Sequence, residues 1–336
     1  MNTIFRRGTT ALIISLVFSV GSFSQKVSKA GSISEQNVRA EMNFLASDAM
    51  QGRGSGTQFE RIAAEYIGSQ FMQLGLLPGG DINLITHAQS YVQAVTFKRR
   101  NGDEGKTYNA IGFLNGTDKN LRPEVILLSS HLDHLGVRES APGDDKIFNG
   151  ADDDASGTVA VLELARTLAA GKRPKRTVYF VCFGSEEVGG FGANYFVTNL
   201  PFPKDKFVAN LEFEMIGRPD AAVKPDELWL TGFERSNLGT ELAKRGAKLV
   251  QDPHPDQNFF MRSDNFTLAR QGIIAHTVSS YGLHKDYHKA SDEISTIDFS
   301  HMTRSISSIV GPVQWLVNSN FVPAWNEGKN PSLSPR

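Results

Sequence analysis

The sequence predicts one globular α/β domain with a central mixed, mostly parallel β-sheet sandwiched between helices. Short apolar runs alternate along the chain with helix-length segments, which is the pattern of α/β folds. No internal repeat, low-complexity block or linker divides the 336 residues, a length that suits one such domain. The composition, 40% hydrophobic and 21% charged, is that of an ordinary globular protein.

The helices are predicted from apolar spacing and from end signals. Thr57 stands three residues before Glu60, as in a capping box, and Gly75 follows the last apolar position, where a helix commonly ends. Gly171 and Gly272 end two further segments in the same way. We therefore expect helices over residues 35–47, 57–74, 156–170, 235–247, 263–270 and 299–318.

The strands are predicted from runs rich in β-branched and aromatic residues. Residues 124–130 (EVILLSS) and 177–183 (TVYFVCF) are apolar without alternation, which is typical of strands buried on both faces of a sheet. The second run contains Cys182, the single cysteine of the chain, so an intramolecular disulfide is impossible and a small buried side chain is expected. The other expected strands are 91–97, 108–114, 208–216, 228–231 and 273–278.

The N-terminus has the pattern of an export signal. Arg6 and Arg7 precede the ten-residue apolar run 11–20, and small residues follow it. The run is too short to span a bilayer easily, although a retained membrane anchor is the alternative. We expect a signal peptide over 1–24, a catalytic domain over 25–325, a flexible tail over 326–336, and a periplasmic or extracellular protein without a membrane attachment after cleavage. The net charge of −1 and the absence of a basic, aromatic-rich block argue against a nucleic-acid partner.

Imidazoles and carboxylates collect where the predicted strands end. In α/β sheets ligands bind beyond the carboxyl ends of the strands, so these side chains are expected to converge. Histidine nitrogen and carboxylate oxygen are ligands of zinc, and two zinc ions can share a carboxylate and a water. The motifs are His131 with Asp133, the run 152–154, Glu186 with Glu187, Glu214, and His288.

The residues alone leave several assignments open. We favour Asp153 as the shared carboxylate, because three adjacent aspartates repel one another and a helix start relieves that repulsion only in part. One glutamate of the pair Glu186 and Glu187 would bind zinc, and the other would act as general base, provided that the chain bends after Gly184. Glu212 competes with Glu214, and His284 competes with His288. Asp133 and Asp292 would orient His131 and His288, and Tyr287 would stabilise an oxyanion or simply pack.

Together these segments resemble the secreted co-catalytic dizinc aminopeptidases, the bacterial leucine-aminopeptidase-like zinc exopeptidases. The matching stretches are LASDAMQGRGSGT, YNAIGFLNG, SSHLDHLG, NGADDDASGT, FGSEEVGGFGA, FEMIGR, RSDNF and DYHKASDE. The resemblance implies one zinc on His131, Asp153 and Glu214, and a second on Asp153, Glu187 and His288. It also implies Glu186 as general base, Asp133 as support for His131, and a cis peptide between Asp153 and Asp154.

The chain departs from the family pattern at two positions. Glu214 stands where many members have aspartate, and Asn265 stands where histidine is frequent. The expected activity is that of an aminopeptidase acting on peptides with a free N-terminus. The alternatives are a carboxypeptidase or dipeptidase, with Arg218 or Arg262 holding a substrate carboxylate, and a non-enzymatic receptor-like module that kept the fold.

Overall fold

The central sheet is mixed, as expected, with its parallel strands in the middle. The computed structural model describes residues 32–99 and 102–333, so the predicted signal peptide lies outside the described residues. Within them nine strands form the sheet in the order β1-β3-β7-β4-β8-β11-β9-β10, and β2 pairs with β3. The strands are β1 (Leu77–Pro78), β2 (Val92–Lys98), β3 (Glu104–Leu114), β4 (Val125–His131), β7 (Thr177–Phe183), β8 (Phe207–Phe213), β9 (Leu228–Leu230), β10 (Leu249–Gln251) and β11 (Ala275–Ser279).

Parallel pairing runs through the four central strands, whereas antiparallel pairing dominates the edges. β4 lies between β7 and β8, and β8 pairs with β11, all in the same direction. β3 is antiparallel to each of its neighbours, and β9 is antiparallel to β11. The carboxyl ends of β7, β4, β8 and β11 therefore meet along one edge of the sheet.

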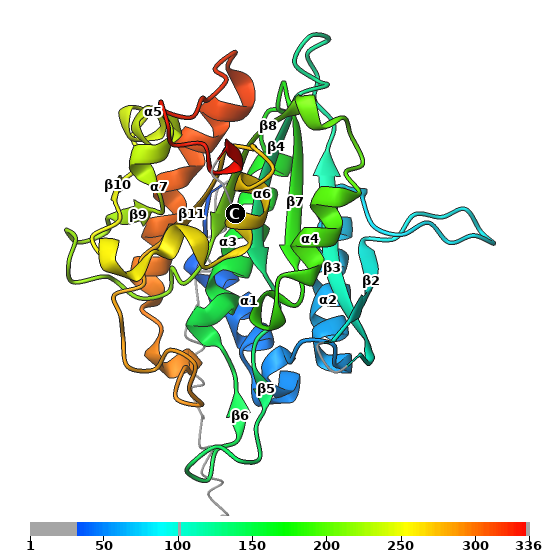
Figure 1. Cartoon of the computed structure of the whole chain (residues 1–336), viewed down its shortest axis with the longest axis vertical. Helices are drawn as coiled ribbons and strands as arrows, with labels where there is room; N and C mark the ends of the chain where they lie inside the picture. The colour runs from blue at the N-terminus through cyan, green and yellow to red at the C-terminus, as the bar shows by residue number, and fades with distance from the viewer. Residues whose placement is uncertain (1–31, 100–101, 334–336) are drawn as a thin grey trace, which may run out of the picture.

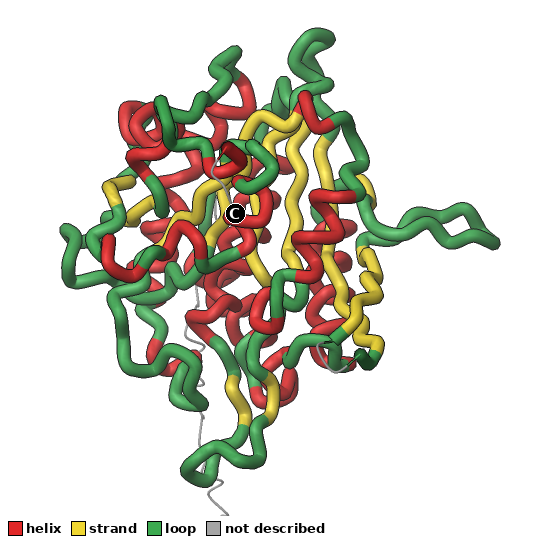
Figure 2. The backbone as a smooth tube through the Cα atoms, viewed as in Figure 1, coloured by secondary structure: helices red, strands yellow, loops and turns green. Residues whose placement is uncertain are grey.

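Helices cover both faces of the sheet (Figure 1, Figure 2). Side chains of α1, α2, α3, α5 and α7 pack in one core with Ile126 and Leu128 of β4. Those of α4 and α6 pack in a second core with Val125 and Leu127 of the same strand, because successive strand residues face opposite sides. The helices are α1 (Glu35–Leu45), α2 (Gln58–Gln73), α3 (Gly157–Ala170), α4 (Phe191–Thr198), α5 (Leu238–Lys244), α6 (Asp264–Ala269) and α7 (Phe299–Asn318).

Most element boundaries agree with the sequence patterns. Thr57 caps α2 by accepting hydrogen bonds from the backbone N–H groups of Phe59 and Glu60. Gly75 follows that helix with φ +74°, a conformation that glycine adopts without strain. All seven residues of β4 and of β7 are buried, as their unbroken apolar runs predicted, and all seven residues of β8 are buried as well.

Several features were not expected from the sequence, among them the short strands β1 and β10. Helix α4 was missed, because its eight residues follow the flexible pair Gly189 and Gly190 and give too short a pattern to recognise. The stretch 132–153 contains a small hairpin formed by β5 (Gly136–Val137) and β6 (Ile147–Phe148). The expected strand over 208–216 stops at Phe213, so Glu214 lies just beyond its end.

The chain ends are described only in part. The first residue of the predicted tail, Asn326, donates a backbone hydrogen bond to the carbonyl of Arg235 at 2.7 Å, and the flexibility of the segment stays a prediction. Over residues 32–99 and 102–333, no helix has both the length and the apolar character that crossing a membrane requires.

Candidate metal centre

The predicted ligands do meet at the carboxyl edge of the central strands. His131 is the last residue of β4, and Glu214 directly follows β8. Glu187 follows β7, and Asp153 lies in the helical turn Ala151–Ser156 that leads into α3. His288 comes from the loop after β11, where its φ is +56°. The topology therefore gathers five side chains that span more than 150 positions of sequence.

A first donor set consists of His131, Asp153 and Glu214, whose ligand atoms all lie within 4.8 Å of one another. His131 Nε2 is 3.1 Å from Asp153 Oδ1. The other ring nitrogen, Nδ1, lies 3.2 Å from the main-chain oxygen of Asp133. A carbonyl can only accept, so Nδ1 donates to it, and Nε2 is the ring nitrogen that faces the carboxylate of Asp153.

A second donor set shares Asp153 and adds Glu187 and His288. His288 Nε2 is 3.2 Å from Asp153 Oδ2 and 3.2 Å from Glu187 Oε2. His134 also faces this set, with Nδ1 2.7 Å from Glu187 Oε1 and 3.7 Å from Asp153 Oδ2. His134 was not expected from the sequence, although its place three residues after His131 in SSHLDHLG could have indicated it.

Several polar atoms of these sets are buried without any hydrogen-bond partner. They include His131 Nε2, His134 Nδ1, Asp153 Oδ2 and Glu187 Oε1. Buried polar atoms are nearly always satisfied in folded proteins, and carboxylates confined together repel one another. Imidazole and carboxylate donors with unused lone pairs pointing into one space fit divalent cations such as zinc.

The structure separates the three adjacent aspartates into different roles. Asp152 accepts hydrogen bonds from the N–H of Gly217 at 2.8 Å and from Ser156 Oγ at 3.1 Å. Asp154 accepts from the N–H groups of Gly157 at 2.9 Å and Met215 at 3.1 Å. Asp153 is the one of the three that directs its carboxylate at both His131 and His288, and the peptide between Asp153 and Asp154 is cis, as the resemblance implied.

The open choices between neighbouring residues are also decided by hydrogen bonds. The Glu212 carboxylate accepts hydrogen bonds from Ser263 Oγ, the N–H of Asn265 and Thr277 Oγ1. Glu214 is therefore the glutamate that belongs to the first donor set. His284 lies 3.0 Å from Asp152 Oδ2, outside both donor sets.

Two expected supporting roles differ in detail from the structure. The carboxylate of Asp133 lies beside His131, with Oδ1 at an ion-pair distance of 3.8 Å from His131 Nδ1. It also accepts the backbone N–H groups of Glu186 at 3.0 Å and Glu187 at 3.4 Å, and therefore fixes the segment that carries both glutamates.

Asp292, by contrast, forms neither a hydrogen bond nor an ion pair with His288 in the part of the chain that the structure describes. It accepts the N–H groups of Asp152 at 3.0 Å and Asp153 at 3.1 Å, and so holds the backbone of the turn that carries Asp153. Adjacency in sequence suggested both pairings, whereas the folded loops turn each carboxylate toward backbone donors.

The pair Glu186 and Glu187 reaches the site through the expected bend. Ser185 has φ +62°, and its N–H donates to Glu60 Oε1 at 3.0 Å. A Cβ on Gly184 would lie 2.3 Å from Thr107 Oγ1, so only glycine allows this close approach. Burial raises the pKa of Glu186 well above its ordinary value, and the carboxylates of Asp264, Glu214 and Glu187 raise it further, while His131 opposes them.

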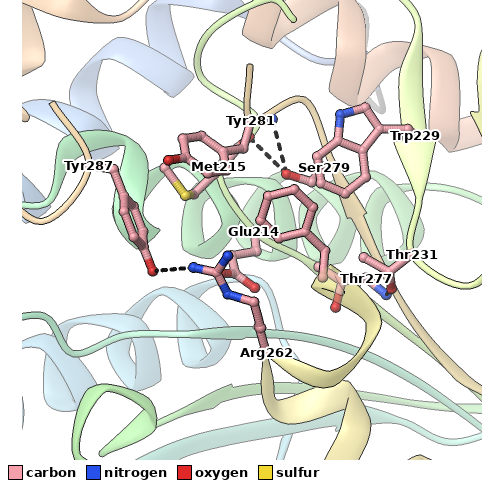
Figure 3. Close-up of a pocket in the computed structure, with 10 residues that line it drawn as sticks. Glu214, Met215, Trp229, Thr231, Arg262, Thr277, Ser279, Tyr281 and Tyr287 are labelled. Atoms are coloured by element: carbon pink, nitrogen blue, oxygen red, sulfur yellow. Dashed lines mark hydrogen bonds between the residues drawn. The ribbon is translucent and has the colours of Figure 1, made fainter. Parts of the chain in front are cut away.

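A pocket adjoins the first donor set (Figure 3). Glu214 lines it together with Trp229, Tyr281 and other apolar or hydroxyl side chains. Arg262 also lines it, and its Nη2 donates to the Tyr287 hydroxyl at 3.3 Å, as the dashed line in Figure 3 marks. Tyr287 stacks on His288 with ring centroids 3.8 Å apart. Its contact with an oxyanion stays a prediction.

Known proteins share both the sequence motifs and the fold. The chain is 27% identical over 238 residues to the leupeptin-inactivating enzyme 1 of Streptomyces exfoliatus, covering 66% of this chain and 51% of that protein. It thus spans about half of the length of this relative.

Two solved structures have the same fold. The aminopeptidase from Aneurinibacillus sp. strain AM-1 superposes with a TM-score of 0.65 at 16% identity, covering 86% of this chain and 95% of that one. The zinc aminopeptidase BSAP from Bacillus subtilis superposes with a TM-score of 0.64 at 16% identity, covering 87% and 97%.

The family model described as Peptidase family M28 matches residues 109–311, which is more than half of the chain and includes every residue of both donor sets. The protein belongs to peptidase family M28.

Proposed function

We propose that the protein is an aminopeptidase that works with two zinc ions, one at each donor set. The supporting observation is the position of Asp153, which offers Oδ1 to His131 and Oδ2 to His288 from one buried carboxylate. One carboxylate that serves both sets is the arrangement that a pair of neighbouring divalent ions requires. The titles of the two solved structures, both aminopeptidases, agree with this proposal.

Bound zinc would polarise the scissile carbonyl and lower the pKa of a water molecule between the ions. The chain itself supplies the proton transfers. Glu186 stands beside both donor sets and is not needed as a ligand, so its carboxylate accepts a proton from the attacking water and passes it to the leaving amine. The backbone N–H of Glu186 is held by Asp133, which fixes the base relative to His131.

The acidic character of the site supports selection of a free N-terminus. A protonated amine would lie among Glu186 and Glu214, and the adjoining pocket would receive the first side chain of the peptide. Arg218 is paired with Asp286 at 2.9 Å and is therefore occupied.

Arg262 is the residue that favours the alternative activity, that of a carboxypeptidase or dipeptidase. Its guanidinium lies in the pocket and could pair with a substrate carboxylate. Blocking the N-terminus of a test peptide separates the two activities. An aminopeptidase does not cleave the blocked peptide, whereas a carboxypeptidase cleaves it at the same rate as the unblocked one.

We further propose that the protein is exported, to the periplasm or beyond the cell. The support is the cationic, apolar and small-residue order of positions 1–24. Fractionation of cells expressing the full chain, with N-terminal sequencing of the exported form, tests the proposal. Cleavage near position 24 supports it, and an uncleaved protein in the cytoplasm contradicts it.

Glu186→Gln tests the mechanism. The amide keeps the size of the side chain but cannot accept the proton, so we expect turnover of aminoacyl p-nitroanilides to fall about 10²–10⁴-fold. Zinc content should stay at the wild-type level, because Glu186 belongs to neither donor set. The matched control is Glu65→Gln on the surface of α2, which should retain full turnover. Near-normal turnover of the Glu186 variant would remove it from the role of base.

A further inference from the structure

We propose that His134 binds the second metal ion directly through Nδ1, so that Asp153, Glu187, His288 and His134 all hold this ion. The inference rests on the proposed function, because it adds a ligand to the same two-zinc site. The resemblance implied His288 as the histidine of the second set and gave no role to His134. With His134 the centre contains three imidazoles rather than two.

The first support is the position of the imidazole. His134 is 1% exposed, and its Nδ1 faces the carboxylates of Glu187 at 2.7 Å and Asp153 at 3.7 Å. One ligand atom each of His134, Asp153 and Glu187 lie within 4.8 Å of one another, a limit that the first set also meets. Two ligand atoms of one tetrahedral zinc are roughly 3.3 Å apart, given bonds of about 2.0–2.1 Å.

The second support is that His134 Nδ1 and Glu187 Oε1 are two close donor atoms, 2.7 Å apart in a buried space. Neither atom has another hydrogen-bond partner among the described residues. His131 Nε2 and Asp153 Oδ1 form a similar close pair, 3.1 Å apart, in the first donor set. A cation bound between a nitrogen and a carboxylate oxygen would satisfy both atoms of such a pair.

The third support is that packing fixes the ring. A Cβ built on Gly150 would lie 2.5 Å from His134 Cγ and 2.6 Å from Cδ2, so the Gly150 backbone presses against the imidazole. The backbone N–H of His134 donates to the carbonyl of Arg53 at 3.2 Å. The ring is held before any ion arrives, which is the preorganisation that a metal ligand needs.

The two histidines of the second set differ in exposure. The His288 side chain is 38% exposed and comes from a loop, whereas the His134 side chain is fully buried. We therefore expect the second ion to remain bound when His288 is removed, because His134 and the two carboxylates still hold it. Replacing His134 by alanine should lower the affinity for the second ion at least as much as replacing His288.

Zinc binding tests the inference without any substrate. In zinc-buffered solutions we expect wild type to bind two ions, and His134→Ala to bind the first normally and the second at least 10-fold more weakly. The control is His284→Ala, which removes a nearby imidazole outside both donor sets and should leave both affinities unchanged. Equal zinc affinities of wild type and His134→Ala would overturn the inference.

Loss of an orienting group could also weaken zinc binding, so a second measurement separates the two roles. In crystals of the zinc-loaded wild-type protein, anomalous scattering locates the ions. A distance of about 2.0–2.1 Å from His134 Nδ1 to the second ion is expected of a ligand. A distance beyond about 3 Å, with Nδ1 donating to Glu187, would overturn it even if the alanine variant did not fold. Failure of wild type to bind two ions would instead refute the proposed function.

Discussion

Arg53 offers a sharp test of how the fold supports the metal centre. It is 1% exposed, and within residues 32–99 and 102–333 its side-chain hydrogen bonds all go to main-chain carbonyls. The guanidinium donates to four main-chain carbonyls, those of Leu45, Leu132, Asn149 and Gly150. Leu132 follows His131 of the first donor set, and Gly150 precedes the turn that carries Asp153. Arg53 therefore ties together the two loops that hold the first donor set.

Arg53→Lys keeps the positive charge but replaces a planar fork by one ammonium group. An ammonium has three N–H donors, so at least one of the four carbonyls is left without a partner. Each unsatisfied buried acceptor costs about 1–3 kcal/mol, so we expect a loss of at least about 1–3 kcal/mol in the free energy of unfolding. Zinc affinity should also fall, because the loops that position His131 and Asp153 are no longer held.

The assay is urea unfolding followed by tryptophan fluorescence, together with zinc titration of the folded protein. The matched control is Arg61→Lys on the exposed face of α2, where a surface pair with Glu65 contributes little and no change above about 0.5 kcal/mol is expected. A loss below 1 kcal/mol in Arg53→Lys, with unchanged zinc affinity, would show that these hydrogen bonds do not support the site.

Three further outcomes are expected. Burial lowers the pKa of His276 to about 4, so the unfolded chain alone takes up its proton between pH 6.5 and 4. The contribution of His276 to the free energy of unfolding is therefore fully present above pH 6.5 and falls by about 3 kcal/mol toward pH 4. Urea unfolding of His276→Gln in the presence of a chelator should show a weaker dependence of this free energy on pH than the wild type. Gly157→Ala should cost about 1–3 kcal/mol in thermal unfolding, because its Cβ would lie 2.1 Å from the carbonyl oxygen of Phe213, whereas Gly311→Ala has open space and should not destabilise. Chelation should lower the melting temperature and added zinc should restore it, since bound ions stabilise only the folded state; an unchanged melting temperature would contradict zinc binding.

Local patterns were sufficient for most of the fold. The unbroken apolar runs of β4 and β7 indicated buried strands, and the apolar spacing of α7 located that helix at residues 299–318, as the structure has it. Such elements are predictable because their burial follows directly from their own sequence. Helix α4 escaped prediction because its stability comes from packing of Ala193 and Phe196 in the second core rather than from its eight residues alone.

The site was predictable in its composition and less so in its hydrogen bonds. Strand ends placed His131, Glu187 and Glu214 at one edge, which any parallel sheet would do. The hydrogen-bond partners of the Asp133 carboxylate depend on how the segment after β7 folds back. That segment bends at Ser185 and brings the N–H of Glu186 to Asp133. His134 was missed because a second histidine three residues after the first indicates a ligand only when the loop curls it toward the same carboxylates.

The sequence by itself determined the α/β class, the family resemblance and the set of side chains that could bind metal, because these depend on residue type and on order along the chain. Only the tertiary structure decided which members of that set face one another. Glu212 and Glu214 are chemically identical, and so are Asp152, Asp153 and Asp154. Their roles differ because backbone and hydroxyl donors satisfy Glu212, Asp152 and Asp154, while Asp153 and Glu214 are left directed toward His131.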